Sequence, residues 1–225
     1  MIIRFIRYLT LLLLFLFNPA ILFAQVDSQL IDYQTNDTDN QISSDNLIID
    51  SEYNLLEALE GISVPYSIRK NLELVTVNYY GFDDKLHQGQ LIVNKNVAAE
   101  VKEIFDEIRK IKFPVEKVIP LSKYNWSDDE SMKDNNTSAF NHRYISGTRI
   151  LSMHAKGLAI DINPKQNPYI KNDVISPPGA TYNPDIKGTI NINSSIVKIF
   201  KKRGWSWGGD WTSLKDYQHF QKDLD

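Results

Sequence analysis

Two histidines and two aspartates in the last third of the chain have the side chains of a catalytic zinc site. His154 and Asp161 are seven residues apart, and His219 follows Asp216 by three residues. Two imidazoles and one carboxylate would leave a fourth tetrahedral position for water, whereas a structural zinc site fills all four positions with protein ligands. A carboxylate outside that set could accept the proton of the water. This pattern indicates a zinc hydrolase.

The same residues also allow a simpler interpretation. Short patterns of His and Asp arise by chance, and a lone histidine is more often a packed or exposed side chain than a metal ligand. Asp216 could also orient His219 through a hydrogen bond instead of acting as a base. Spacing alone leaves these alternatives open.

Only tertiary structure could bring the candidate ligands together. His154 and Asp161 are seven positions apart, too far for two ligands on adjacent turns of a helix. The composition of 158–162 is that of a buried strand, and Gly157 allows a tight turn before it. His219 comes 58 residues after Asp161, so a distant part of the chain must supply it.

Strands and helices can be predicted on both sides of these residues. The ranges 74–80 and 90–94 are rich in β-branched and aromatic residues, with a glycine-containing turn between them, and predict two strands. Apolar residues at helical spacing predict helices over 97–111 and 194–202.

Two further stretches are expected to be irregular. The range 126–140 is polar and is predicted to be a loop over the site. The range 165–189 contains four prolines, which favour an irregular excursion. Long loops in compact domains often serve as lids or substrate walls. A surface insertion without a role is the alternative for 165–189.

Two long segments resemble a known family. Asn141 to Pro164 reads NHRYISGTRILSMHAKGLAIDINP, and Gly204 to His219 contains GWSWGGDW followed by DYQH. Both resemble the VanY-type peptidases, which are zinc D-alanyl-D-alanine carboxypeptidases and their L-alanyl-D-glutamate endopeptidase relatives. The endopeptidase branch is nearer, because the carboxypeptidases often have Glu where this chain has Asp216. The resemblance extends from about Leu74 to Phe220.

This resemblance implies a fold, a cofactor and a substrate. The fold would be a small α+β domain of the Hedgehog/DD-peptidase type, an antiparallel sheet with flanking helices. The cofactor would be one Zn²⁺ held by His154, Asp161 and His219. Asp216 would be the general base, with Asp210 as the competing candidate. The substrates and partners would be peptidoglycan peptides.

Other residues near the motifs are candidates for contact with the substrate. The family has an arginine upstream of the first zinc ligand, and Arg143 matches it better than Arg149 as the group that stabilises an oxyanion. Ser152 could hydrogen-bond the substrate or fix the turn of His154. Trp207 and Trp211 could belong to the core or form an aromatic wall beside His219.

Composition excludes several classes of function. A net charge of −3 gives no basic surface for nucleic acid, so no nucleic-acid partner is expected. The absence of cysteine excludes disulfides, thiol catalysis, Cys-type zinc sites and a lipid anchor on cysteine. We expect a monomer.

The N-terminal residues resemble an export signal. Residues 1–24 combine a short basic start, an apolar run shorter than the roughly 18 residues of a spanning helix, and Ala24 at the cleavage position. An uncleaved membrane anchor is the alternative. Residues 25–50 are polar and predict a flexible linker, which leaves 51–225 as the zinc peptidase domain. The mature protein is expected to be secreted or periplasmic, without stable membrane insertion.

A catalytically inactive module that holds zinc and binds the cell wall is the competing function. Asp216 and Arg143 argue against such a module, since binding alone requires neither a base nor an oxyanion donor.

Overall fold

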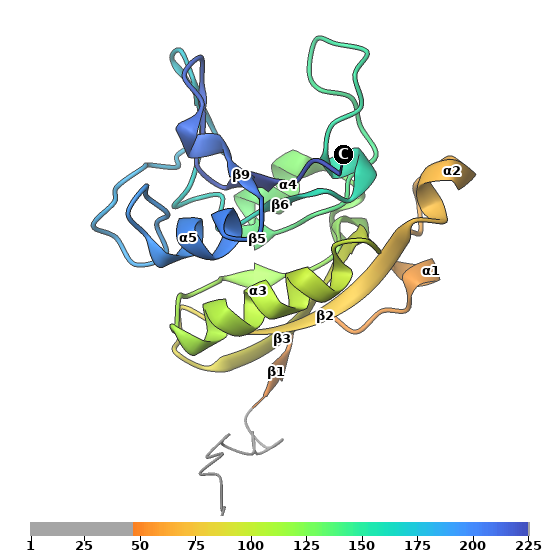
Figure 1. Ribbon diagram of the computed structural model, residues 1–225, viewed down its shortest axis with the longest axis horizontal. Coiled ribbons are helices and arrows are strands. Elements are labelled where there is room, and N and C mark those ends of the chain that lie inside the picture. The colour runs from red at the N-terminus through yellow and green to blue at the C-terminus, as the bar shows by residue number, and fades with distance from the viewer. Residues whose placement is uncertain (1–46, 225) are drawn as a thin grey trace, which may run out of the picture. The chain divides into compact units, whose positions relative to one another are not determined.

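The computed structural model describes residues 47–224, and the predicted signal peptide lies outside this range (Figure 1). The described residues form a mixed α+β domain with a few helices, which confirms the predicted class. Four small sheets replace the predicted antiparallel sheet, and two of their strand pairs are parallel. The Hedgehog/DD-peptidase fold therefore stays a prediction.

A long hairpin and one helix form the first layer of the domain. Strands β2 (Leu72–Tyr80) and β3 (Leu86–Asn94) pair antiparallel over nine residues each, longer than the predicted strands. Helix α3 (Ala98–Lys110) packs its apolar face on this hairpin and confirms the helical spacing (Figure 1). Strand β1 (Ile48–Ile49) pairs parallel with β3. The folded domain therefore includes residues that were predicted to be linker.

A second, smaller core lies beside this hairpin. It contains Ala58, Leu59, Leu72, Ile92 and Phe140, with Trp126 packed against it. Two short helices border it, α1 (Leu55–Ala58), which begins with a capping box on Asn54, and α2 (Tyr66–Arg69).

The prediction of a loop over 126–140 is wrong. This range contains helix α4 (Asp128–Lys133) and strand β5 (Asn136–Thr137), which pairs parallel with β4 (Lys117–Val118). A short 3-10 helix, η2 (Leu121–Tyr124), precedes it. Ser127 caps α4 by accepting from the amide of Glu130, so the polar residues that favoured a loop instead begin a helix.

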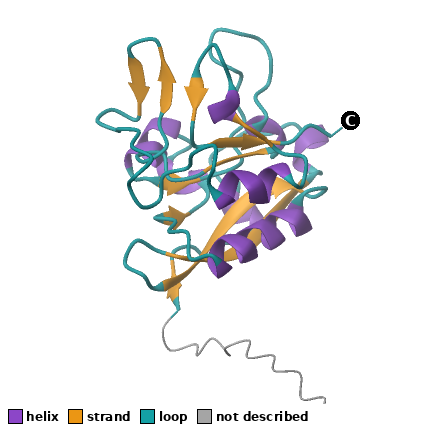
Figure 2. Cartoon of the chain, turned by 60° about the vertical axis from the view of Figure 1, so that its left-hand side comes forward, coloured by secondary structure: helices purple, strands orange, loops and turns teal. Residues whose placement is uncertain are grey.

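A three-stranded sheet holds the candidate site. Its strand order is β6 (Ala159–Asp161), β11 (His219–Gln221) and β9 (Ser206–Trp207), all antiparallel. The 3-10 helix η3 (His154–Lys156) precedes β6. This part of the domain consists mostly of short strands and loops (Figure 2).

The range 165–189 is more regular than predicted. Strands β7 (Tyr169–Lys171) and β8 (Val174–Ser176) form a hairpin, and β10 (Lys215–Asp216) pairs with β7. The short 3-10 helix η4 (Gly208–Asp210) precedes β10. The hairpin therefore extends to the strand that carries Asp216.

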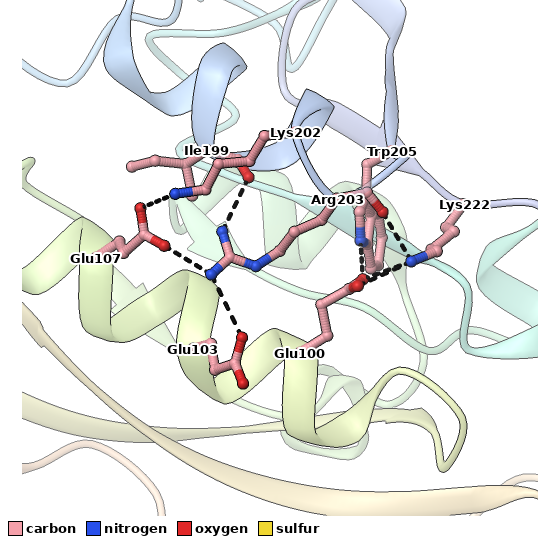
Figure 3. Close-up of polar contacts among 8 residues, drawn as sticks. All are labelled: Glu100, Glu103, Glu107, Ile199, Lys202, Arg203, Trp205 and Lys222. Carbon is pink, nitrogen blue, oxygen red and sulfur yellow. Dashed lines mark hydrogen bonds and ion pairs between the residues drawn. The ribbon is translucent and has the colours of Figure 1, made fainter.

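A polar network joins α3 to helix α5 (Ser195–Lys201) and to the end of β11. Glu100 accepts from Lys222 at 2.8 Å and from the indole of Trp205 at 2.5 Å (Figure 3). Glu107 accepts from Arg203 at 2.6 Å and from Lys202 at 2.5 Å. These contacts connect the first layer to the sheet of the candidate site. No helix among residues 47–224 is long and apolar enough to cross a membrane.

Candidate metal centre

The three predicted zinc ligands converge on one point. Nε2 of His154 lies 3.1 Å from Nδ1 of His219 and 3.2 Å from Oδ2 of Asp161. Nδ1 of His219 lies 2.9 Å from Oδ1 of Asp161. Donor atoms about 2.0 Å from a tetrahedral zinc lie about 3.3 Å from one another. The two ring nitrogens and the carboxylate of Asp161, which turns one oxygen toward each histidine, therefore have nearly the spacing that one zinc ion requires.

Strand register and a tight turn place these side chains. Asp161 and His219 are directly opposite each other on β6 and β11, so their side chains share one face of the sheet. His154 reaches the same point from η3, which ends at Gly157 with a φ of +68°. A Cβ at Gly157 would lie 2.6 Å from the amide nitrogen of Asn94, so both conformation and space favour glycine there. His154 thus depends on a local turn, whereas Asp161 and His219 depend on the pairing of two strands that lie far apart in the sequence.

Hydrogen bonds on the outer ring nitrogens prepare both histidines for a metal. Nδ1 of His154 lies 2.5 Å from the carbonyl oxygen of Ala139, and Nε2 of His219 lies 2.9 Å from Oε1 of Gln221. These oxygens accept hydrogen bonds, so in the neutral rings they hold the proton on the outer nitrogen. The inner nitrogens then present lone pairs to the carboxylate of Asp161. The two inner nitrogens and the carboxylate of Asp161 are all electron-rich and repel one another. A cation between them would remove that repulsion, so this donor set fits a cation.

The charges and hydrogen bonds among these residues shift their pKa values in the directions that favour positive charge. Burial acts to lower the pKa of His219, but hydrogen bonding to Asp161 and the charges of Asp161 and Asp216 raise it to about 9. Burial acts to raise the pKa of Asp161, but the charges and hydrogen bonds of His154 and His219 hold it well below its usual value. The pocket therefore strongly favours positive charge.

Asp216 lies close enough to respond to the charges of the three ligands. Burial raises its pKa to about 6; the negative charge of Asp161 adds to this rise, and His219 opposes it. Its Oδ1 is buried and has no hydrogen-bond partner among the described residues. A Cβ on Gly208 would lie 2.5 Å from the carbonyl oxygen of Asp216, so glycine permits this close approach. The arrangement leaves a buried carboxylate oxygen without a hydrogen-bond partner among the described residues.

The structure gives the two arginines and Asp210 different surroundings. Arg143 forms an ion pair with Asp128 of α4, and its side chain is 40% exposed. Its carbonyl oxygen accepts from the amide of Ser152, so it lies on the chain segment next to His154. Asp210, the competing base, forms an ion pair with Lys201 at 2.6 Å on the surface. No contact of Arg149 with the ligands is found among the described residues.

Of the two predicted tryptophans, Trp211 lies beside one of the candidate ligands. Its ring centroid is 5.3 Å from that of His219. Trp207 is only 2% exposed and its indole donates to the carbonyl oxygen of Tyr217, so it belongs mainly to the core. Trp207 also borders a pocket of about 620 Å³ that Tyr182, Lys215 and Tyr217 line.

Ser152 has the second of its two predicted roles. Its side chain is buried, and its hydroxyl accepts from the amide of Ala155 at 3.1 Å. It thereby fixes the turn that carries His154. Contact of Ser152 with a substrate stays a prediction.

The remaining histidine with carboxylate partners lies apart from the ligands. His87 on β3 places Nδ1 3.0 Å from Oδ2 of Asp50 and Nε2 3.1 Å from Oδ1 of Asp83. The hydroxyl of Tyr79 also donates to Asp50. We call His87, Asp50, Asp83 and Tyr79 the His87 cluster.

Sequence reasoning missed Gln221 and the carbonyl of Ala139. A backbone carbonyl has no sequence signal, because any residue supplies one. Gln221 had a weak signal, since it lies two residues after His219 and side chains two apart on a strand share a face.

A family model described as D-alanyl-D-alanine carboxypeptidase matches residues 146–222. The matched range contains the three candidate ligands and Asp216, whereas Arg143 lies just before it. Searches of curated proteins and of solved structures found no match. The match confirms the resemblance to VanY-type peptidases over these residues and supports a peptidase.

Proposed function

We propose that the protein is a zinc-dependent peptidase that hydrolyses peptide bonds in the stem peptides of peptidoglycan. The observation that carries this proposal is the convergence of one ring nitrogen each of His154 and His219 on the two carboxylate oxygens of Asp161, with spacings of 2.9–3.2 Å and acceptors on both outer nitrogens. The family match over the same residues supports a peptidase instead of another zinc hydrolase.

His154, Asp161 and His219 would hold the zinc. When bound, the ion supplies Lewis-acid activation of water and of the scissile carbonyl. Asp216 accepts the proton of the attacking water on its unpartnered Oδ1 and then delivers it to the leaving amine. Burial raises the pKa of this carboxyl and makes it a stronger base for that proton, whereas the positive charge of a bound cation would keep it ionised.

Arg143 would donate to the oxygen on which negative charge develops. A guanidinium stays charged and offers several donors in a fixed geometry. Its ion pair with Asp128 holds it at the surface next to the segment of His154, where a substrate could reach it. Trp211 would border the same substrate on the side of His219.

Two bonds are candidates for hydrolysis. The description of the matching family favours the D-Ala-D-Ala bond. Aspartate at position 216 favours the L-Ala-D-Glu bond, as the resemblance implies. We further propose that the enzyme acts as a monomer outside the cytoplasm, where peptidoglycan is found.

The experiment is digestion of purified peptidoglycan by the mature protein, with the products identified by mass spectrometry. Loss of one terminal alanine would identify a carboxypeptidase, and cleavage between L-alanine and D-glutamate would identify an endopeptidase. Arg143→Ala is expected to retain zinc and to release amino groups more slowly by about 10²-fold. Arg149→Ala is the matched control and should cleave at the wild-type rate. Zinc binding without any hydrolysis would instead support the wall-binding module.

A further inference from the structure

The two histidines of the candidate metal centre use opposite ring nitrogens. His154 presents Nε2 to the other ligands, and His219 presents Nδ1. For His154, the acceptor on the outer nitrogen is the backbone carbonyl of Ala139, which every residue type at that position would supply. For His219, the acceptor is the side chain of Gln221. Only the second acceptor depends on residue type.

Two acceptors compete for the single proton of a neutral His219 ring. Oδ1 of Asp161 lies 2.9 Å from Nδ1, and Oε1 of Gln221 lies 2.9 Å from Nε2. A proton on Nδ1 would satisfy Asp161 but would block the nitrogen that faces the other ligands. A proton on Nε2 leaves Nδ1 free and satisfies Gln221. The tautomer that can bind a metal is therefore the one that Gln221 stabilises.

We propose that Gln221 is a positioning residue that sets the tautomer of His219 and thereby makes Nδ1 a metal ligand. This inference rests on the zinc site of the proposed function. Gln221 does not touch the metal itself; it acts through the ring of His219.

The fold places Gln221 for this role. His219 and Gln221 are two residues apart on β11, so their side chains lie on one face. Ala159 on β6 is directly opposite Gln221, and its methyl side chain leaves room for the longer amide to turn toward His219. Lys222, the next residue, is fixed by Glu100 and by the carbonyl oxygen of Arg203, which holds this end of the strand in place (Figure 3).

The test compares Gln221→Leu with Gln221→Glu in the mature full-length protein, with zinc alone as the probe. Leucine has a similar size but cannot accept a hydrogen bond, so zinc affinity measured against a chromophoric chelator should fall about 10- to 100-fold. Glutamate keeps an acceptor at the same position, so its affinity should match or exceed that of the wild type. Gln88→Leu, at a half-buried position on β3 away from the ligands, is the matched control and should bind zinc normally.

A spectroscopic readout separates positioning from packing. Long-range proton–nitrogen NMR in chelator, at an alkaline pH at which the His219 ring is neutral, should show its proton on Nε2 in the wild type, and in the leucine variant that proton should move to Nδ1 or be shared between tautomers. If Gln221→Leu does not fold in chelator, Gln221→Asn replaces it, since asparagine is polar but too short to reach Nε2. Wild-type affinity and an unchanged tautomer in the folded variant would overturn the inference alone. Absence of zinc binding by the wild type would overturn the proposed zinc site as well.

Discussion

The candidate metal centre and the His87 cluster are both built from histidine and aspartate, yet they gather their atoms differently. In the metal centre, three side chains from η3, β6 and β11 direct one atom each to a common point. In the His87 cluster, Asp50 and Asp83 lie on opposite sides of a single ring. The two groups contain nearly the same residue types, but only in the metal centre do the side-chain atoms point toward one another from separate elements.

This difference determines what each cluster can hold. In the His87 cluster, the two ring nitrogens face carboxylate oxygens on opposite sides of the ring, so they do not meet a second ligand at a common point. In the metal centre the outer nitrogens have carbonyl acceptors, and the lone pairs face inward. A metal site is thus distinguished by free lone pairs that converge, which residue types alone do not show.

Removal of a converging ligand should have the largest effect. His154→Ala, Asp161→Ala and His219→Ala are each expected to lose zinc and all hydrolysis, because three ligands leave no redundancy. His87→Ala should keep stoichiometric zinc. Metal content after dialysis and release of amino groups from peptidoglycan measure both. Full zinc occupancy in the His219 variant would show that convergence in the structure does not identify the ligands.

Asp216→Asn tests the free carboxylate beside the three ligands. Zinc should stay bound, whereas loss of the base should slow hydrolysis by on the order of 10² to 10⁴. In the metal-free protein the folded pKa of Asp216, about 6, exceeds the usual 3.8, so its ionisation destabilises the fold as pH rises through 6. The variant should therefore be more stable at pH 7, by about 1–3 kcal/mol.

Chemical denaturation in chelator measures that stability change. Below pH 4 the advantage of the asparagine variant should disappear, since the aspartate is then neutral in both states. A loss of zinc by Asp216→Asn would instead show that Asp216 supports the metal site, and the base would have to be sought elsewhere.

Zinc affinity should depend on pH in the metal centre. Because the pKa of metal-free His219 is about 9, zinc must displace a proton at neutral pH. Apparent affinity should rise about tenfold per unit up to pH 9, so that binding at pH 7 is about 100-fold weaker than above pH 9. Titration with competing chelators from pH 6 to 10 measures this slope. A flat profile would mean that no proton occupies the site.

Asp83→Asn should have the smallest effect. Asp83 is 41% exposed, and such an ion pair contributes about 0–1 kcal/mol. Interactions with the amide of Lys85 and with His87 lower the pKa of Asp83, so its small contribution exists above pH 4 and is lost as pH falls further. Thermal unfolding measures the change, and zinc affinity should be unaltered. An effect on zinc would show that the two clusters are coupled.

The sequence predicted which side chains converge better than it predicted their surroundings. His154, Asp161 and His219 lie in motifs whose residue types reflect the chemistry directly, and α3 and α5 follow from apolar spacing. The acceptor of His154 could not be predicted, because a backbone carbonyl leaves no trace in the sequence. The polar range 126–140 favours a loop locally, but it folds as α4 and β5 because Ser127 caps the helix and β5 pairs with β4.

Trp207 is another residue whose role the sequence alone could not decide. An aromatic residue near a catalytic motif fits a substrate wall as well as a core, and only packing against Phe220 and Tyr217 decides. The structure places it in the core, whereas Trp211, four residues later, remains beside His219.

The register of β11 would link zinc binding to the correct pairing of the strands. His219 lies opposite Asp161 only in the observed pairing of a three-residue strand, and a slip by one residue would turn its side chain to the other face. Joining these strands closes a long stretch of chain, which is entropically costly and slow compared with local contacts. Because an ion that binds only the native pairing stabilises it by mass action, zinc would retain correctly paired molecules. Molecules with the wrong register would remain metal-free and exposed to proteolysis.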